Sequence, residues 1–417
     1  MKSRDAILVI FVAMLVCSIN TGSLLVSADG TVTPEGPYID TLMFKVLSGI
    51  PEEVPALLNG EIDLIGEMVT TDYLDMLTTD PNIAIDSVPR NGYGYFVINC
   101  DRYPLNETAL RRAWAFALDK QRISDEVWNG YSSLQDSLVP RGNPFSIEEQ
   151  LTYHYYDANP TEGNRLLDEA GFLDIDDDGY REAPDGSDFT VVLNTADISP
   201  ISMGCGDIGT DALLSLGIDV LHEPIPFNNY LQRVQYGRHY DAAFFGRNFL
   251  DLSVDWLAFE YWSEMAYDPT NNYPNFMNDT YDSWRDQLLH SADYSEVYEA
   301  AIEMQRILVY QCPQIVAYNN LQFSAYRTDR FEGHVLDSID GIHGWWTNQK
   351  VHLKDSEGGP IGGTFTKSLP WGLSSYNPLT IVSTQDISVH EMLWDSLLRQ
   401  DSNGALIPWL AESYTSE

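Results

Sequence analysis

The sequence predicts an α/β fold in which strands alternate with single helices. Short apolar or β-branched runs are followed by amphipathic segments with apolar residues at helical spacing. Turn-forming pairs such as Asn59-Gly60 and Asn129-Gly130 end several of the amphipathic segments. With 417 residues, 44% of them hydrophobic and 20% charged, the chain can bury large cores and is too apolar to be disordered. We therefore expect more than one lobe, each built around a largely parallel sheet.

The first part of the chain is expected to be rich in strands and to lead into one long helix. Aromatic and β-branched residues in 93–99 indicate a buried strand. Apolar residues at helical spacing in 106–127 indicate an amphipathic helix. The other predicted strands are 42–47, 62–64 and 83–88, and the other predicted helices are 56–58 and 72–77.

The second part largely alternates between helices and strands, which is typical of βαβ units. The predicted helices are 161–170, 208–216, 227–236, 281–291 and 294–310. The predicted strands are 189–194, 218–222, 240–245 and 314–318. Ligands of such sheets bind at the carboxyl ends of strands or between lobes, so we expect the site there.

The amino-terminal segment 1–28 has the features of a signal peptide. Lys2 and Arg4 precede the apolar run 6–19, and Val26-Ser27-Ala28 provides a small-residue cleavage site. We therefore expect an exported protein, located extracellularly or at the outer face of the cytoplasmic membrane. Beyond this segment, Cys100, Cys205 and Cys312 allow at most one disulfide, whose pairing the sequence leaves open.

Charge and missing motifs exclude several classes of function. The formal charge of −39 repels phosphate backbones, so we expect no nucleic-acid binding. Nucleophile-elbow, zinc-protease and phosphate-loop motifs do not occur in the sequence, which favours a binding protein over an enzyme. A secreted carbohydrate-active hydrolase with paired carboxylates stays open as an alternative, because acidic residues are abundant.

Four segments in the expected order carry a resemblance to a known family. They are 55–63 (PALLNGEID), 111–130 (RRAWAFALDKQRISDEVWNG), 165–182 and 212–245. In these segments the chain resembles the extracellular solute-binding proteins of peptide, oligopeptide and nickel ABC importers. The resemblance implies a periplasmic-binding-protein-like fold with two lobes, mixed or parallel sheets and a hinge. It further implies a monomer that needs no cofactor, captures a peptide-like or other small polar solute and delivers it to an ABC permease.

The family's opening passage appears at the far end of this chain, in 363–369, 376–379 and 401–413. We expect 38–110 to belong to the first lobe, 111–325 to form the second lobe, and 326–360 to return to the first. Segment 361–417 is expected to begin a second family copy, or to complete the first lobe of a circularly permuted protein. In both arrangements the trailing strand in 363–369 can pair with the lobe that contains 42–47. A fragment of a tandem protein that binds no ligand stays open as a third interpretation.

The resemblance places candidate ligand contacts after the strand 240–245. A carboxylate there would bind a peptide ammonium, and an arginine would bind a carboxylate in bidentate fashion. Further candidates share one face of the strand 93–99 or lie in the glycine-rich passage near 345. The predicted ligand-binding residues are Tyr93, Tyr95, Asn99, Arg247, Asn248, Asp251, Asp255 and Trp345.

A second candidate site has the spacing of a calcium-binding loop. Oxygen donors follow at the positions that a calcium loop uses, and Gly179 stands where such a loop turns sharply. The predicted calcium ligands are Asp174, Asp176, Asp178, Tyr180 and Asp185.

Overall fold

The computed structural model describes residues 36–197, 199–268, 271–381 and 384–415. The expected signal peptide 1–28 lies outside these residues. All elements below belong to the compact unit formed by residues 37–417. None of the helices in the described ranges is long and apolar enough to cross a membrane.

The main sheet is mixed, and strand β8 joins its two parts. Strand β5 is parallel to β6 and β7, whereas β3 is antiparallel to both β7 and β8. The sheet is thus less parallel than expected, because β3 and β8 run antiparallel to their neighbours. The strand order is β2 (Ile83–Pro89), β8 (Gln314–Arg327), β3 (Gly92–Ile98), β7 (Ala242–Asn248), β5 (Val191–Ala196) and β6 (Val220–Ile225), with the short β4 (Ser132–Ser133) beside β8.

Strand β8 belongs to both lobes. Its first half pairs with β3, with Val97 opposite Gln314, while its second half pairs with β2, with Ile83 opposite Arg327. The expected strand 314–318 is therefore only the first third of the element. Because one continuous strand crosses between the two lobes, it is suited to act as a hinge.

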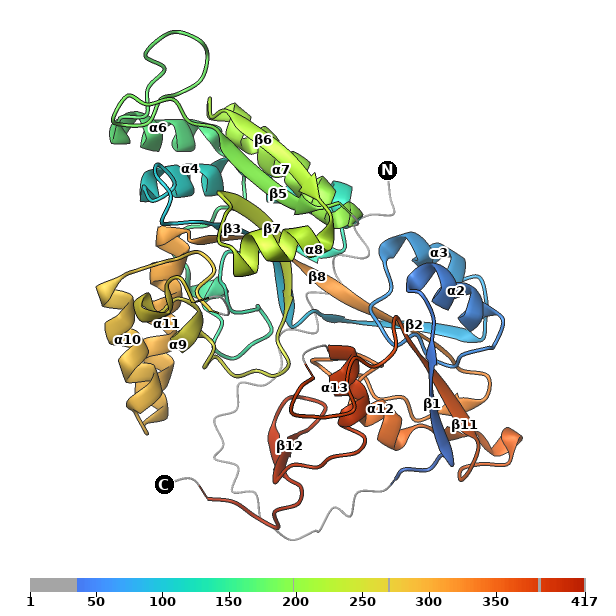
Figure 1. Cartoon of the computed structure of the whole chain (residues 1–417). Helices are drawn as coiled ribbons and strands as arrows, with labels where there is room; N and C mark the ends of the chain where they lie inside the picture. The colour runs from blue at the N-terminus through green and yellow to red at the C-terminus, as the bar shows by residue number, and fades with distance from the viewer. Residues whose placement is uncertain (1–35, 198, 269–270, 382–383, 416–417) are drawn as a thin grey trace, which may run out of the picture. The chain divides into compact units, whose positions relative to one another are not determined.

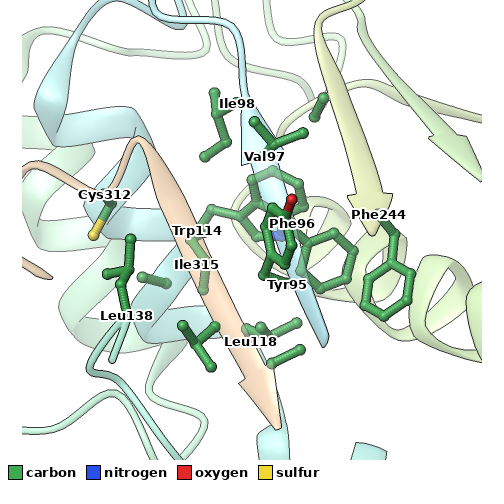
Figure 2. Packing of buried hydrophobic residues seen from close by; sticks show 14 of the residues in the cluster. Tyr95, Phe96, Val97, Ile98, Trp114, Leu118, Leu138, Phe244, Cys312 and Ile315 are labelled. Atoms are coloured by element: carbon green, nitrogen blue, oxygen red, sulfur yellow. The ribbon is translucent and has the colours of Figure 1, made fainter. Parts of the chain in front are cut away.

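Separate hydrophobic cores define the two lobes. The second lobe is packed around Phe96, whose ring lies 5.1 Å from Trp114 and 5.2 Å from Phe244 between centroids (Figure 2). The first lobe has two smaller cores, one around Val54 and Leu57 and one around Phe365. Each lobe thus buries its own apolar residues, as expected of independently packed units.

The second lobe has helices packed around its part of the sheet. Helix α7 packs against β5 and β6, α4 packs against α6, and α10 and α11 form an antiparallel pair (Figure 1). These helices are α4 (Thr108–Ala117), α6 (Pro160–Ala170), α7 (Pro200–Ser215), α10 (Asp279–His290) and α11 (Tyr294–Gln311), and the shorter α5 (Lys120–Arg122), α8 (Phe227–Leu231) and α9 (Leu257–Glu260) connect them.

The predicted helix 106–127 is wrong as a single element. It is broken at Leu118, whose backbone is extended with φ −66° and ψ 120°. The carboxylate of Asp119 then accepts a hydrogen bond from the Arg122 amide and caps a new short helix. A side chain that caps a helix competes with the continuous helical path, which explains the break.

The first lobe combines segments from both ends of the described chain. Strand β1 (Thr41–Val46) pairs in parallel with β11 (Thr364–Leu369), as expected for the trailing strand. Leu64 bridges this pair to β8 through Tyr326 and Lys367, where a strand 62–64 was expected. The other elements are α2 (Ile50–Leu58), α3 (Leu74–Leu77), β9 (Phe331–Glu332), α12 (Trp345–Lys350), β10 (His352–Leu353), α13 (Thr384–His390), β12 (Leu398–Gln400) and β13 (Leu406–Pro408).

Candidate functional site

A cavity of about 410 Å³ lies where the two lobes meet. The first lobe contributes residues 66–70 and 339–348, Lys367 of β11 and one side of α13. The second lobe contributes Asn248, Phe249 and Leu250 at the carboxyl end of β7. A cavity bounded by both lobes near a shared strand is the arrangement in which hinge motion can enclose a ligand.

Two further cavities adjoin this one. A cavity of about 310 Å³ shares Leu250, Asp340 and Trp345 with it and extends toward β12. A cavity of about 390 Å³ shares Met68 and is lined mainly by aromatic and aliphatic side chains of the second lobe, including Tyr230 and Phe244. The first of these cavities has a mainly polar lining and the second a mainly apolar one.

Arg247 stabilises the end of β7 and is not free to bind a ligand carboxylate. Its guanidinium forms a bidentate ion pair with Glu260 and lies 4.3 Å from the ring centroid of Phe249 and 4.6 Å from that of Trp256. The next residue, Asn248, lines the cavity and accepts a hydrogen bond from Arg90. Arg247 therefore positions this segment, while Asn248 presents its amide to the cavity.

Asn91 holds the loop that follows β7. Its Nδ2 donates to the carbonyl oxygens of Phe249 at 3.0 Å and Asp251 at 2.9 Å. Asp251 lines the cavity toward β12, and its carboxylate accepts a hydrogen bond from the amide of Ser253 at 2.8 Å. Asp255 is exposed outside the three cavities and accepts a hydrogen bond from the Ser253 hydroxyl.

The candidates on β3 lie in the core of the second lobe and do not reach the cavity. Tyr93 and Tyr95 are buried in the cluster around Phe96. Asn99 donates to the carbonyl of Tyr240 at 3.0 Å and accepts from Asn275 at 2.9 Å, so its amide cross-links loops. Because β3 pairs with β7 on one side and β8 on the other, its backbone is also unavailable to an added peptide strand.

Trp345 lies in the cavity wall at the start of α12. Its Nε1 donates to the carbonyl of Glu391 at 3.2 Å, and the Arg399 guanidinium lies 3.8 Å from its ring centroid. The rings of Trp346 and Trp409 meet it edge to face at 4.9 and 5.3 Å. This aromatic cluster fixes the orientation of the indole that faces the cavity.

The first lobe contributes a charged wall that the sequence analysis missed. Glu67, Asp340 and Glu391 line the cavity together with buried Lys367, which donates to the carbonyl oxygen of His343. Burial lowers the pKa of Lys367 to about 8. Partial desolvation of the carboxyl group, together with the neighbouring carboxylates, raises the pKa of Asp340 to about 7. A lysine within the short alternating run TFTKSL was the one available signal for this wall.

Three aspartates of the predicted calcium loop lie close together in the structure, and Glu182 stands in the place expected for Asp185. Ligand oxygens of Asp174, Asp176, Asp178 and Glu182 lie within 4.8 Å of one another. The Tyr180 amide donates to Asp178 at 2.8 Å, so Tyr180 belongs to the same turn. Asp185 instead accepts hydrogen bonds from the backbone and hydroxyl of Ser187. Glu182, and not Asp185, is therefore the fourth carboxylate of the cluster.

The three cysteines of the described chain form no disulfide with one another. Cys205 and Cys312 are buried, and Cys100 is partly buried. Burial raises the pKa of all three thiols. A buried thiol with a raised pKa is a poor nucleophile, so these residues are structural.

Comparison with known proteins gives a family and several distant relatives. Residues 31–268 match the model of the bacterial extracellular solute-binding proteins, family 5 middle region. The peptide transport periplasmic protein SapA of Salmonella typhimurium is 22% identical over 316 residues, which cover 72% of this chain and 52% of SapA. The oligopeptide-binding protein AppA of Bacillus subtilis is 22% identical, with 74% of this chain and 56% of AppA covered.

Solved structures share the fold at low sequence identity. The structure of Bacillus subtilis AppA in complex with a nonapeptide superposes with a TM-score of 0.62 at 17% identity, over 72% of this chain and 58% of that one. A mannohexaose-bound oligopeptide transporter component of Thermotoga maritima gives 0.60 at 20% identity, over 72% of this chain and 60% of that one. The chain spans about half the length of the curated relatives it matches. The family model, which matches more than half of the chain, and the lobes joined through β8 lead to one conclusion: this chain belongs to the bacterial extracellular solute-binding proteins of family 5.

Proposed function

We infer that this protein captures a small peptide-like solute between its two lobes and delivers it to an ABC permease. The family consists of solute-binding proteins, and the relatives named above include peptide transport and oligopeptide-binding proteins. The mechanism is binding followed by closure about β8, with no chemical change to the solute. The protein acts outside the cytoplasmic membrane as a monomer and needs no cofactor for binding.

The observation that carries this proposal is the cavity of about 410 Å³ lined from both lobes. Its volume falls within the range of about 300 to 1,000 Å³ that small-molecule sites occupy. The loop 249–251, held by Asn91, forms one wall, and the segment 339–348 forms the opposite wall. A solute that contacts both walls binds the closed arrangement better than the open one, and this difference drives closure.

A thermal-shift panel tests the proposal. It contains di- to pentapeptides, a manno-oligosaccharide and nickel–histidine, since solved relatives were crystallised with an oligosaccharide and with Ni(L-His). At one hundred times its dissociation constant a true ligand adds about 2.7 kcal/mol to the free energy of unfolding. We expect peptides to raise the melting temperature, and the absence of any peptide effect would contradict the proposal.

A matched pair of variants locates the binding. Leu250 lines two of the cavities and is 58% exposed, so Leu250→Trp fills the cavity without disturbing a core. Leu221, 54% exposed on β6, gives the control Leu221→Trp. We expect only the Leu250 variant to lose the peptide-induced shift. Catalytic turnover of an oligosaccharide would instead support a hydrolase.

A further inference from the structure

Acceptor groups crowd the first-lobe wall of the cavity. Glu67, Asp340 and Glu391 all line it, and none of the three forms an ion pair with another described residue. The wall reaches into the adjoining cavity, where Asp340 and Glu391 are joined by Asp251. Two cations also lie here: the Lys367 ammonium already donates a hydrogen bond to the carbonyl of His343, and the Arg399 guanidinium, in the adjoining cavity, lies against the Trp345 ring.

An independent observation indicates a missing hydrogen-bond donor at this wall. Asn348, on α12, lines the same cavity and is 2% exposed. Its Nδ2 donates to the Met392 sulfur at 3.6 Å, but its Oδ1 has no hydrogen-bond partner within the described chain. A buried amide oxygen without a donor costs about 1 to 3 kcal/mol, so such an atom in a binding cavity indicates a ligand group that supplies the donor.

The carboxylates of Asp340 and Glu391 also lack a direct partner among the described residues. Both residues are exposed, line the cavity and form no ion pair within the described chain. Partial desolvation raises the pKa of both carboxyl groups, and Asp337 adds repulsion. Lys367 offsets part of the negative charge of both, and Arg399 part of that of Glu391, without a direct hydrogen bond. A ligand cation in direct contact with the two carboxylates would offset more of this charge.

We propose that this wall selects peptides carrying a Lys or Arg side chain, and that Asn348, Asp340 and Glu391 hold the cationic group. This assignment rests on the proposed function and narrows its substrate class. The ligand's ammonium or guanidinium donates to the amide oxygen and neutralises the two carboxylates. Such charge-assisted hydrogen bonds are about twice as strong as neutral ones. The adjoining apolar cavity, which shares Met68 with this one, is left for the remainder of the peptide.

Calorimetric titration with three tripeptides tests this inference. Ala-Lys-Ala, Ala-norleucine-Ala and Ala-Glu-Ala differ in the charge of one side chain of similar length. We expect the lysine peptide to bind at least about tenfold more tightly than the norleucine peptide, since one charge-assisted bond is worth that much. The double variant Asp340→Asn, Glu391→Gln should reduce this ratio to within about threefold.

The control variant is Asp157→Asn, which removes an exposed carboxylate outside the cavity lining. It should leave the ratio unchanged, and affinity for the norleucine peptide should persist in the double variant. Equal binding of all three peptides would overturn the charge selection while leaving the proposed function intact. If no peptide binds, the proposed function fails and this inference fails with it. If the double variant keeps the affinity ratio between the lysine and norleucine peptides, other residues recognise the charge and the assignment is wrong.

Discussion

Lys120 and Asp136 form the most deeply buried ion pair among the described residues of the second lobe. The Lys120 Nζ is 2.5 Å from Asp136 and donates to the carbonyl of Gln135 at 2.7 Å, and the side chains of the pair are at most 1% exposed. Lys120→Met leaves the buried Asp136 carboxylate with the His154 ring and the Tyr155 amide but without the Lys120 ammonium, which costs about 3 to 5 kcal/mol. We expect urea denaturation to show a loss of that size.

The exposed pair between Lys45 and Glu61 provides the control, since its side chains are 34% and 52% exposed. Lys45→Met should change the free energy of unfolding by less than about 1 kcal/mol. Equal losses in the two variants would contradict the view that burial makes the difference.

Glu53, in α2, is fully buried behind the cavity wall. Burial and repulsion from Glu67 raise the pKa of Glu53 to about 8. The folded state then keeps a proton that the unfolded state releases above its ordinary pKa near 4.3. Stability therefore falls as pH rises from about 4.3 to about 8, by at most about 1.4 kcal/mol per pH unit.

We expect the urea midpoint of the wild type to decrease across this window. Glu53→Gln should flatten the decrease, and the exposed control Glu299→Gln should not. The contrary result is a wild-type urea midpoint that rises between pH 5 and 8, with the same rise in the Glu53→Gln variant. It would show that Glu53 is ionised in the folded state.

At the scale of elements, local patterns predicted the existence of helices and strands better than their extents. Helix α6 ends at Ala170, the last residue of the predicted helix, and Gly171 follows it in the left-handed conformation with φ 87°. Helix α7 instead begins well before the predicted 208, because Ser199 caps it and Pro200 follows. The length of β8 depends on pairing with β2 and β3, which a local pattern does not contain.

The same limit applies to the candidate site. Asn248 and Asp251 were proposed from the resemblance and Trp345 from its glycine-rich passage, and all three line the cavities. Tyr93, Tyr95 and Asn99 could not be distinguished from core, since alternation along a strand does not reveal that both faces are covered. Asn348, Lys367 and Glu391 meet at the cavity only through tertiary packing of the trailing segment.

The loop 174–182 carries a prediction of its own. Three aspartates and Glu182 converge, and Gly179 takes φ 96°, which permits the sharp turn of a calcium loop. We expect Ca²⁺ to raise the melting temperature, with a dissociation constant of about 10⁻⁴ to 10⁻³ M as in extracellular modules. Asp176→Ala should abolish the effect, whereas Asp157→Asn should retain it. No shift at saturating Ca²⁺ in the wild type would rule out the site.

For the whole molecule, the charge of −39 sets how the fold responds to salt. Repulsion among like charges opposes the compact state more than the expanded one. Raising the ionic strength from 0.1 to 1 M shortens the Debye length from about 10 to about 3 Å, which screens this repulsion. We expect the urea midpoint to rise with NaCl, and a midpoint that falls would contradict repulsion as a destabilising factor.

Added NaCl should weaken ligand binding, whereas it should stabilise the fold. The cavity wall around Asp340 and Glu391 attracts a cationic peptide, so screening that relieves repulsion in the fold also weakens this attraction. Ala-Lys-Ala should therefore bind more weakly at 1 M than at 0.1 M NaCl, while the neutral norleucine peptide changes little. The double variant Asp340→Asn, Glu391→Gln separates the two effects, because it should lose the salt dependence of binding and keep the salt dependence of stability. Parallel salt responses of the lysine and norleucine peptides in the wild type would show that the wall does not recognise charge.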